Sequence, residues 1–383
     1  MNILILGGDG YLGWPTAMNL SRLGHQVTVA DNYLRRQLCQ STDSDPLFEV
    51  PNLQERSRLW KEFSGHEVQV RIGDLNDWDF MASLMQNEAL DTIVHYAEQP
   101  SAPYSMLDRT AAELTLKNNI GVTFNVIQAM AQFASDAHLV KLGTMGEYGT
   151  PDIDIEEGWI NIEHKGRQGR FLFPRAGGSL YHTTKILDTD LLWFYVRTWD
   201  LRVTDLMQGP VYGLLTDENR GQESLMSFFN YDDIFGTVLN RFIVQAVNGH
   251  PLTVYGKGGQ TRGYLNIIDT LQCVRLAVET PAQPGELRIF NQFVETFSVN
   301  ELAQRVVDAA GSIDMPVEIK EVINPRKELE DHYYNPAHTG LNDLGLQPTP
   351  LSEAVLTEIL GLVAKHKHRI HPGRIVRDVK WQR

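Results

Sequence analysis

The chain begins with a short apolar stretch, NILIL, that leads directly into the glycine-rich sequence GGDGYLGW. Gly7, Gly10 and Gly13 allow a tight turn and a close approach of the backbone to an anion at the N-terminus of the next helix, where unpaired N–H groups and the helix dipole favour negative charge. Asp31 ends the next apolar stretch, VTVAD, where a carboxylate can accept a hydrogen bond from a ribose 2′-hydroxyl. This combination predicts a dinucleotide site at the end of a buried strand.

Further apolar runs (VQVRIGD, TIVHYAE, HLVKLGT and LRVTDLMQG) alternate with helical patterns. That alternation predicts an α/β fold with a doubly wound parallel Rossmann sheet over residues 1–210, interrupted by long insertions at 33–66 and 150–178. Residues 211–383 are predicted to form a smaller C-terminal α+β domain that binds substrate. PLTVYG, ELRIFNQF and PVEIKEV are its expected strands, and SVNELAQRVVDAAG is an expected helix capped by Ser298 and Glu301. Whether residues from about 263 to 293 return to the first domain is left open.

The formal charge of −14 argues against nucleic acid as a partner, because binding to a phosphate backbone needs clustered Lys and Arg. Only two cysteines occur, without metal-type spacing, so neither a disulfide framework nor a metal site is expected. No apolar run is long enough to span a membrane, and no signal or transit peptide is visible. A cytoplasmic location is expected, or the plastid stroma only if a leader was removed.

The acid at position 31 favours NAD over NADP, since it would repel a 2′-phosphate, although Arg35 and Arg36 follow closely. GDL at 73–75 follows the third apolar run and is expected to meet the adenine, although Asp74 could instead cap a helix. Ala97 ends the fourth run and is expected to face the cofactor crevice. The predicted cofactor-binding residues are Gly7, Gly10, Tyr11, Leu12, Gly13, Asp31, Asn32, Arg35, Asp74, Leu75, Ala97, Asn119, Tyr181, Lys185 and Gln208.

YHTTK places Tyr181 and Lys185 four residues apart, on one face of a helix. A phenol that acts as a base near neutral pH needs its ionised form stabilised, and a neighbouring ammonium group can do this. Thr144 ends the strand HLVKLGT and can hydrogen-bond the hydroxyl that is oxidised. A solvent-facing helix pair is the alternative explanation for the tyrosine and lysine.

With these residues the chain resembles an extended short-chain dehydrogenase/reductase of the NAD-dependent epimerase/dehydratase family that acts on a nucleotide sugar. AEQPSAPYSM, KLGTMGEYGTPDIDIEEG, GHPLTVYGKGGQTRGYL and HYYNPAHT narrow the resemblance to the UDP-sulfoquinovose synthases of sulfolipid biosynthesis. The resemblance implies an enzyme that joins UDP-glucose and sulfite through 4-keto and 5,6-ene intermediates, with tightly held NAD. It also implies a homodimer built on the helix of Tyr181 and Lys185.

The resemblance implies that Tyr181 is the base and later the acid at the C4 hydroxyl, with Lys185 as its electrostatic partner and Thr144 as a donor. Glu147 and His182 are candidates for the proton transfers at C5 and C6, but Glu147 could instead pair with an arginine and His182 could be a packed helix residue. The expected substrate-binding residues are Gln99, Thr144, Gln208, Arg241, Thr261, Arg262 and Arg326, with the last two on the UDP pyrophosphate.

Two departures from expected patterns bear on the chemistry. Met145 and Gly146 follow Thr144 where nucleotide-sugar dehydratases carry Asp and Glu, and Pro100 stands where the synthases usually have Arg. A UDP-sugar 4-epimerase, a 4,6-dehydratase and a paralogue that adds another nucleophile therefore remain as alternatives. A non-catalytic NAD-binding protein is disfavoured, because such a protein is expected to lose Tyr181 or Lys185.

Overall fold

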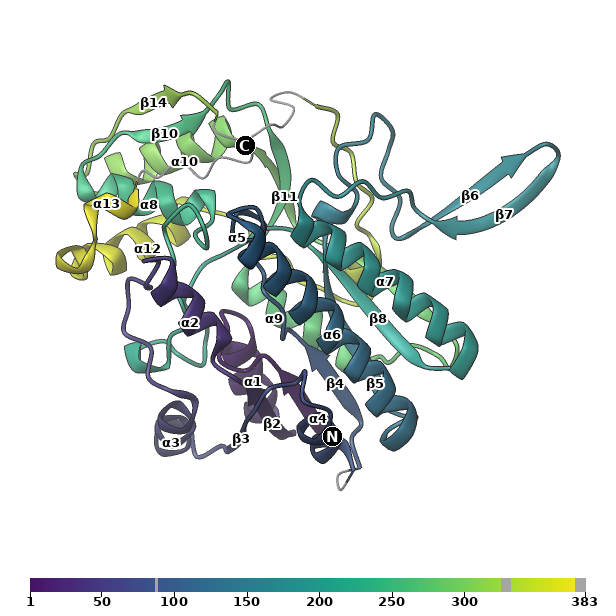
Figure 1. Cartoon of the computed structure of the whole chain (residues 1–383). Coiled ribbons are helices and arrows are strands. Elements are labelled where there is room, and N and C mark those ends of the chain that lie inside the picture. The colour runs from purple at the N-terminus through teal and green to yellow at the C-terminus, as the bar shows by residue number, and fades with distance from the viewer. Residues whose placement is uncertain (87–88, 325–331, 376–383) are drawn as a thin grey trace.

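The computed structural model describes residues 1–86, 89–324 and 332–375. Its centre is a seven-stranded sheet in the order β12-β8-β5-β4-β1-β2-β3 (Figure 1). The strands are β1 (Asn2–Leu6), β2 (Gln26–Asp31), β3 (Val68–Ile72), β4 (Thr92–His95), β5 (His138–Thr144), β8 (Arg202–Gln208) and β12 (Leu287–Gln292). Neighbouring strands pair in parallel, which confirms the doubly wound Rossmann sheet.

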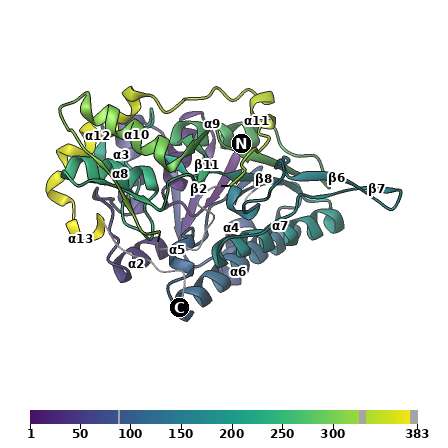
Figure 2. The ribbon, with the colours of Figure 1, turned by 90° about the horizontal axis from the view of Figure 1, so that it is seen from above.

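Helices cover both faces of this sheet because successive strand residues point to opposite sides. Ile3 and Ile5 belong to the core cluster under α1 (Gly13–Arg22) and α9 (Ile267–Glu279). Leu4 and Leu6 belong to the cluster under α4 (Trp78–Met85), α6 (Arg109–Phe133) and α7 (Leu180–Trp199). Figure 2 shows α6 and α7 side by side on one side of the sheet and α9 on the other.

A second core lies in the C-terminal half, between α8 (Val238–Asn248), α10 (Val299–Gly311) and α12 (Glu353–Lys365). Beside these helices β10 (Leu252–Tyr255) pairs with β14 (Ile319–Val322). A three-stranded sheet connects the two halves and consists of β9 (Val211–Tyr212), β11 (Thr261–Asn266) and β13 (Glu295–Ser298). The capping box of Ser298 and Glu301 at the start of α10 is confirmed.

The question left open for residues 263–293 is answered by the strand ELRIFNQF. ELRIFNQF was expected in the smaller domain, but its residues form β12, the edge strand of the main sheet next to β8. The physical reason is that α9 packs on the main sheet, so the chain that follows it returns to that sheet as a parallel strand. The main sheet therefore draws on chain beyond residue 210.

The two long insertions take up different structures. Residues 33–66 form α2 (Leu34–Ser41) and α3 (Leu53–Ser64), whereas residues 150–178 contain a hairpin of β6 (Trp159–His164) and β7 (Arg167–Leu172) that projects from the body (Figure 1). The short helices are α5 (Ala102–Ser105), α11 (Gly340–Asp343), α13 (Pro372–Ile375) and the 3₁₀ turns Met145–Glu147, Glu223–Leu225 and Lys367–Arg369. Among the described residues no helix is both long and apolar enough to cross a bilayer.

Candidate active site

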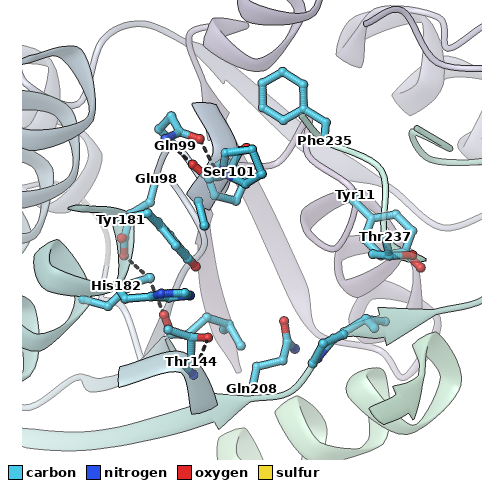
Figure 3. A pocket seen from close by; sticks show the side chains of 18 of the residues that line it. Tyr11, Glu98, Gln99, Ser101, Thr144, Tyr181, His182, Gln208, Phe235 and Thr237 are labelled. Atoms are coloured by element: carbon cyan, nitrogen blue, oxygen red, sulfur yellow. Dashed lines mark hydrogen bonds and ion pairs between the residues drawn. The ribbon is translucent and has the colours of Figure 1, made fainter. Parts of the chain in front are cut away.

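A cavity of about 970 Å³ opens at the carboxyl ends of the central strands, where ligands bind in doubly wound folds. Its walls come from the turn after β1, the ends of β2, β4, β5 and β8, the start of α7, and the loop before α8. In Figure 3 Thr144, Tyr181, His182 and Gln208 gather at one end, with Tyr11, Phe235 and Thr237 across the cavity. This volume is at the upper end of the usual range for ligand sites, so the cavity has room for an extended ligand.

The turn between β1 and α1 requires glycine at two positions, because a side chain there would clash or strain the backbone. A Cβ on Gly13 would overlap the carbonyl of Gly7, 2.9 Å from its carbon, and Gly7 itself has a φ of 88°. Helix α1 then begins with Leu12 at its N-cap and no side chain accepting from its first N–H groups. Because Gly10, Tyr11, Leu12 and Gly13 line the cavity, the start of α1 fits a pyrophosphate.

Asp31 lies at the end of β2 and lines the same half of the cavity. Its Oδ2 accepts from the Asp9 N–H at 2.9 Å and its Oδ1 from the Tyr33 N–H at 2.7 Å. Burial, together with the nearby Asp9 carboxylate, raises the pKa of Asp31 to about 6. The two backbone bonds hold this carboxylate at the cavity wall.

Neither arginine that follows Asp31 is positioned as a simple 2′-phosphate anchor. Arg36 binds the buried Asp9 carboxylate, with Nε 2.7 Å from Oδ2, and Arg56 approaches the same carboxylate at 2.6 Å. Arg35 lines the cavity, but it donates to Asn230 Oδ1 at 2.8 Å and lies over the Phe235 ring, 3.9 Å from its centroid. These contacts support the preference for NAD inferred from Asp31.

The remaining predicted cofactor residues divide into two groups. Asn32, Asp74, Leu75, Ala97 and Gln208 line the cavity. Asn119 does not, because its side chain is buried on α6 between Gln99, whose N–H it accepts at 2.8 Å, and Thr184 Oγ1 at 3.1 Å. Asn119 therefore ties the end of β4 to α7, and its predicted cofactor role would be indirect.

Tyr181 and Lys185 stand on the first turns of α7, which begins after the N-cap Ser179. Both line the cavity together with Thr144, the last residue of β5. The Nζ of Lys185 donates to Leu142 O and to Glu98 Oε1, each at 2.5 Å. The three predicted redox residues thus line the same cavity, and Figure 3 shows Thr144 and Tyr181 at one end of it.

Glu98 is a site residue that sequence reasoning missed. Its side chain is only 2% exposed, yet it lines the cavity beside Tyr181. Burial raises the pKa of Tyr181, and the Glu98 carboxylate raises it further. Tyr181 is therefore uncharged in the protein alone, and a positive charge in the cavity would be needed to favour its ionised form.

His182 occupies the space beside the residue where dehydratases carry an acid. A Cβ built on Gly146 would lie 2.5 Å from His182 Cδ2, so the imidazole packs directly against the bare backbone of Gly146. The Nδ1 of His182 is 3.2 Å from Ser179 Oγ, the N-cap of the helix. Only glycine at position 146 leaves this position to the histidine, which also lines the cavity.

Glu147, the other predicted proton-transfer residue, does not reach the cavity. It is fully buried, and its Oε1 accepts from the Thr144 N–H at 3.2 Å and lies 3.7 Å from Lys141 Nζ. Burial raises the pKa of Glu147, whereas the Lys141 ammonium lowers it. Arg175 Nε is 3.7 Å from Oε2, so the alternative of a partner arginine matches this placement. Glu147 supports the strand end that carries Thr144.

Two of the three predicted substrate arginines also line the cavity. Arg262 lines it and bonds to Thr261 O at 2.7 Å and to His332 Nε2 at 2.9 Å. Arg241 also lines it, over the Tyr255 ring at 4.4 Å. Gln99 also lines the cavity. The Thr261 hydroxyl instead donates to Gly259 O, and Thr261 is not among the lining residues. Arg326 lies outside the described residues.

Comparison with known proteins places this geometry among nucleotide-sugar enzymes. The model of the NAD dependent epimerase/dehydratase family matches residues 3–291. A UDP-sulfoquinovose synthase of Spinacia oleracea is 47% identical over 100% of this chain and 79% of its own length, and one of Sulfolobus acidocaldarius is 42% identical over 100% and 98%. A crystal structure of UDP-glucose 4-epimerase from Bifidobacterium longum in complex with NAD⁺ and UDP superposes on this chain with a TM-score of 0.72. The superposition covers 97% of this chain and 100% of the epimerase, at 17% sequence identity. The two proteins therefore share the fold.

Proposed function

Because this chain belongs to the NAD-dependent epimerase/dehydratase family and, within it, to the UDP-sulfoquinovose synthases, we propose that it joins UDP-glucose and sulfite into UDP-sulfoquinovose with NAD as cofactor. The observation that carries the proposal is the His182 imidazole packed on Gly146, at the end of the strand that bears Thr144. That arrangement keeps the residues for oxidation at C4 and replaces the acid pair of a dehydratase with one histidine.

The cofactor half of the cavity fits NAD. The N-terminus of α1, where the N-cap Leu12 offers no side-chain acceptor, would hold the pyrophosphate, and Asp31 would accept from a ribose hydroxyl. The chemistry that NAD supplies when bound is reversible oxidation at C4 of the sugar. Its positive ring would also counter the negative charge of Glu98 near Tyr181, which raises the pKa of that phenol.

At C4 the residues of this chain would move one proton. Tyr181 accepts the proton of the C4 hydroxyl during oxidation and returns it at the end of the reaction. Lys185 favours the ionised phenol through its charge, and the Thr144 hydroxyl holds the same sugar oxygen. These roles suit three side chains that line one end of the cavity, two of them on a single helix face.

At C5 and C6 the proposed roles fall to His182. The ketone at C4 acidifies the C5 proton, and loss of that proton with the C6 hydroxyl gives the 5,6-ene and water. In the proposal His182 takes the C5 proton and passes it to the leaving C6 hydroxyl, since its imidazole lines the cavity directly against Gly146 and next to the strand end of Thr144. Sulfite then adds at C6, C5 regains a proton, and C4 is reduced again, so the reaction as a whole changes no oxidation state of the cofactor.

The discriminating experiment is incubation of the purified protein with UDP-glucose, with and without sulfite, followed by mass spectrometry. We expect UDP-sulfoquinovose only when sulfite is present. UDP-galactose would indicate the epimerase alternative, and a stable 4-keto-6-deoxy sugar would indicate the dehydratase. Either product in place of UDP-sulfoquinovose would overturn the proposal.

A homodimer through α6 and α7 is part of the proposal. These two helices pack against each other and expose large apolar side chains, namely Leu116 and Phe124 on α6 and Leu187 and Phe194 on α7. Such a paired apolar face is suited to a four-helix contact with a second copy.

We therefore expect light scattering to show a dimer at micromolar concentration and Phe194→Glu to shift it toward monomer. Phe194 is 52% exposed, so the change should leave the fold intact. Phe171→Glu on the projecting hairpin is the matched control, because Phe171 is 53% exposed but lies away from this face. A monomeric wild-type protein, or equal behaviour of both variants, would contradict the dimer.

A further inference from the structure

Arg175 has an unusual environment for a charged residue. It lies in the connection between β7 and α7, lines the cavity, and has a side chain that is only 5% exposed. None of its three buried guanidinium nitrogens has a hydrogen-bond partner among the described residues. The nearest carboxylate oxygens are Glu147 Oε2, 3.7 Å from Nε, and Asp190 Oδ1, 3.7 Å from Nη1.

These two carboxylates balance the charge of Arg175 without satisfying its donors. A guanidinium carries five N–H donors in a fixed fork, and buried charged groups are normally paired and hydrogen-bonded together. The Glu147 carboxylate is also shared with the Thr144 N–H, Thr189 and Lys141. A planar set of buried donors with only distant acceptors is suited to an oxyanion that approaches from the cavity.

The connection that carries Arg175 is fastened to the wall beside His182. The Ala176 N–H donates to Glu147 O at 3.0 Å, which ties it to the 3₁₀ turn that contains Gly146. A Cβ on Gly177 would lie 2.9 Å from His182 Cβ, so the chain immediately after Arg175 packs on the histidine.

The other cations of the cavity have different positions or partners. Lys185 is paired with Glu98, Arg35 with Asn230 in the cofactor half, and Arg241 and Arg262 lie at the substrate end. Pro100, which also lines the cavity, brings no charge. The 150–178 insertion contains three arginines. Arg167 and Arg170 are exposed on the hairpin, whereas Arg175 is the one of the three that lines the described cavity.

We propose that Arg175 supplies the fixed positive charge that holds the anionic second substrate, an oxyanion of the size of sulfite, next to His182. This inference rests on the proposed function and assigns the anion subsite within it. In the addition step a sulfur lone pair forms the bond to C6, the C5–C6 π pair moves toward the C4 ketone, and a proton then returns to C5. Arg175 binds the anion and takes no part in the bond changes.

The test measures how the rate of UDP-sulfoquinovose formation depends on sulfite concentration. Arg175→Met fills a similar buried volume without charge and leaves Lys141 as the cation beside Glu147, and Arg175→Lys keeps the charge without the planar fork. Loss of a charged hydrogen-bond donor predicts a rise in the KM for sulfite of about 10- to 100-fold for the methionine variant and a smaller rise for the lysine variant. The KM for UDP-glucose should stay within about twofold, since the arginines at the substrate end are untouched.

Arg167→Gln is the control, because Arg167 is an exposed arginine of the same insertion and should leave both KM values unchanged. An active Arg175→Met protein with the wild-type KM for sulfite would overturn the anion site while leaving the synthase function in place. If thermal unfolding showed that the methionine variant does not fold, an unchanged KM for sulfite in Arg175→Lys would overturn it instead. A wild-type protein that makes no UDP-sulfoquinovose would overturn the proposed function and this inference with it.

Discussion

Tyr181→Phe is expected to lower the rate of UDP-sulfoquinovose formation by about 10²- to 10⁴-fold, the usual contribution of a positioned acid or base. The change removes only the hydroxyl that exchanges a proton with the C4 oxygen. The ring itself would stay, so the packing of α7 and the shape of the cavity should be preserved. Both the first oxidation and the final reduction at C4 depend on that proton, and the loss should therefore appear in kcat rather than in the KM for either substrate.

Two measurements check this prediction. Mass spectrometry of the product gives the overall rate, and the absorbance of reduced cofactor after mixing with UDP-glucose alone reports the first oxidation. Tyr195→Phe is the matched control, because Tyr195 lies on the same helix but packs against Phe194 and Trp199 outside the cavity. If Tyr181→Phe kept more than about a tenth of the wild-type rate, proton transfer by this residue would not be part of the mechanism.

The sequence was sufficient to predict that the glycine turn, Thr144 and the Tyr181–Lys185 pair line one cavity, because their positions depend on local spacing. The glycines at 7, 10 and 13 must follow a strand and open a helix, and the four-residue interval between Tyr181 and Lys185 fixes one helix face. Thr144 is found by the same logic, since it ends a buried strand of a parallel sheet.

The partners of these residues could not be predicted, because they depend on which strand ends meet in three dimensions. Glu98 follows β4 and reaches Lys185 on α7, 87 residues later in the chain. In the same way, Glu147 follows Thr144 closely in sequence, yet a capping box turns its carboxylate into the buried cluster with Lys141 instead of the cavity. The domain of the edge strand β12 stayed open because its apolar pattern suits either domain, and only the packing of α9 decides between them.

Gly146→Ala is expected to reduce UDP-sulfoquinovose formation by about 10²-fold while oxidation at C4 is retained. The added methyl group would occupy space that now belongs to the imidazole of His182, so the ring must shift. A displacement of about 1 Å in a group that transfers a proton can cost about 10²-fold in rate. The three atoms nearest to the added methyl group all belong to His182, and none belongs to Thr144, Tyr181 or Lys185. Reduced cofactor should therefore still form with UDP-glucose.

Gly361→Ala on α12 is the control for a glycine-to-alanine change, since its added Cβ would meet nothing within 4 Å, and it should leave the rate unchanged. The decisive comparison is a double-mutant cycle with His182→Ala. If Gly146→Ala acts by displacing the imidazole, it should cause little further loss once the imidazole is gone. Fully additive losses would mean that Gly146 serves the active site independently of His182, and the assignment of the C6 proton to this histidine would lose its structural basis.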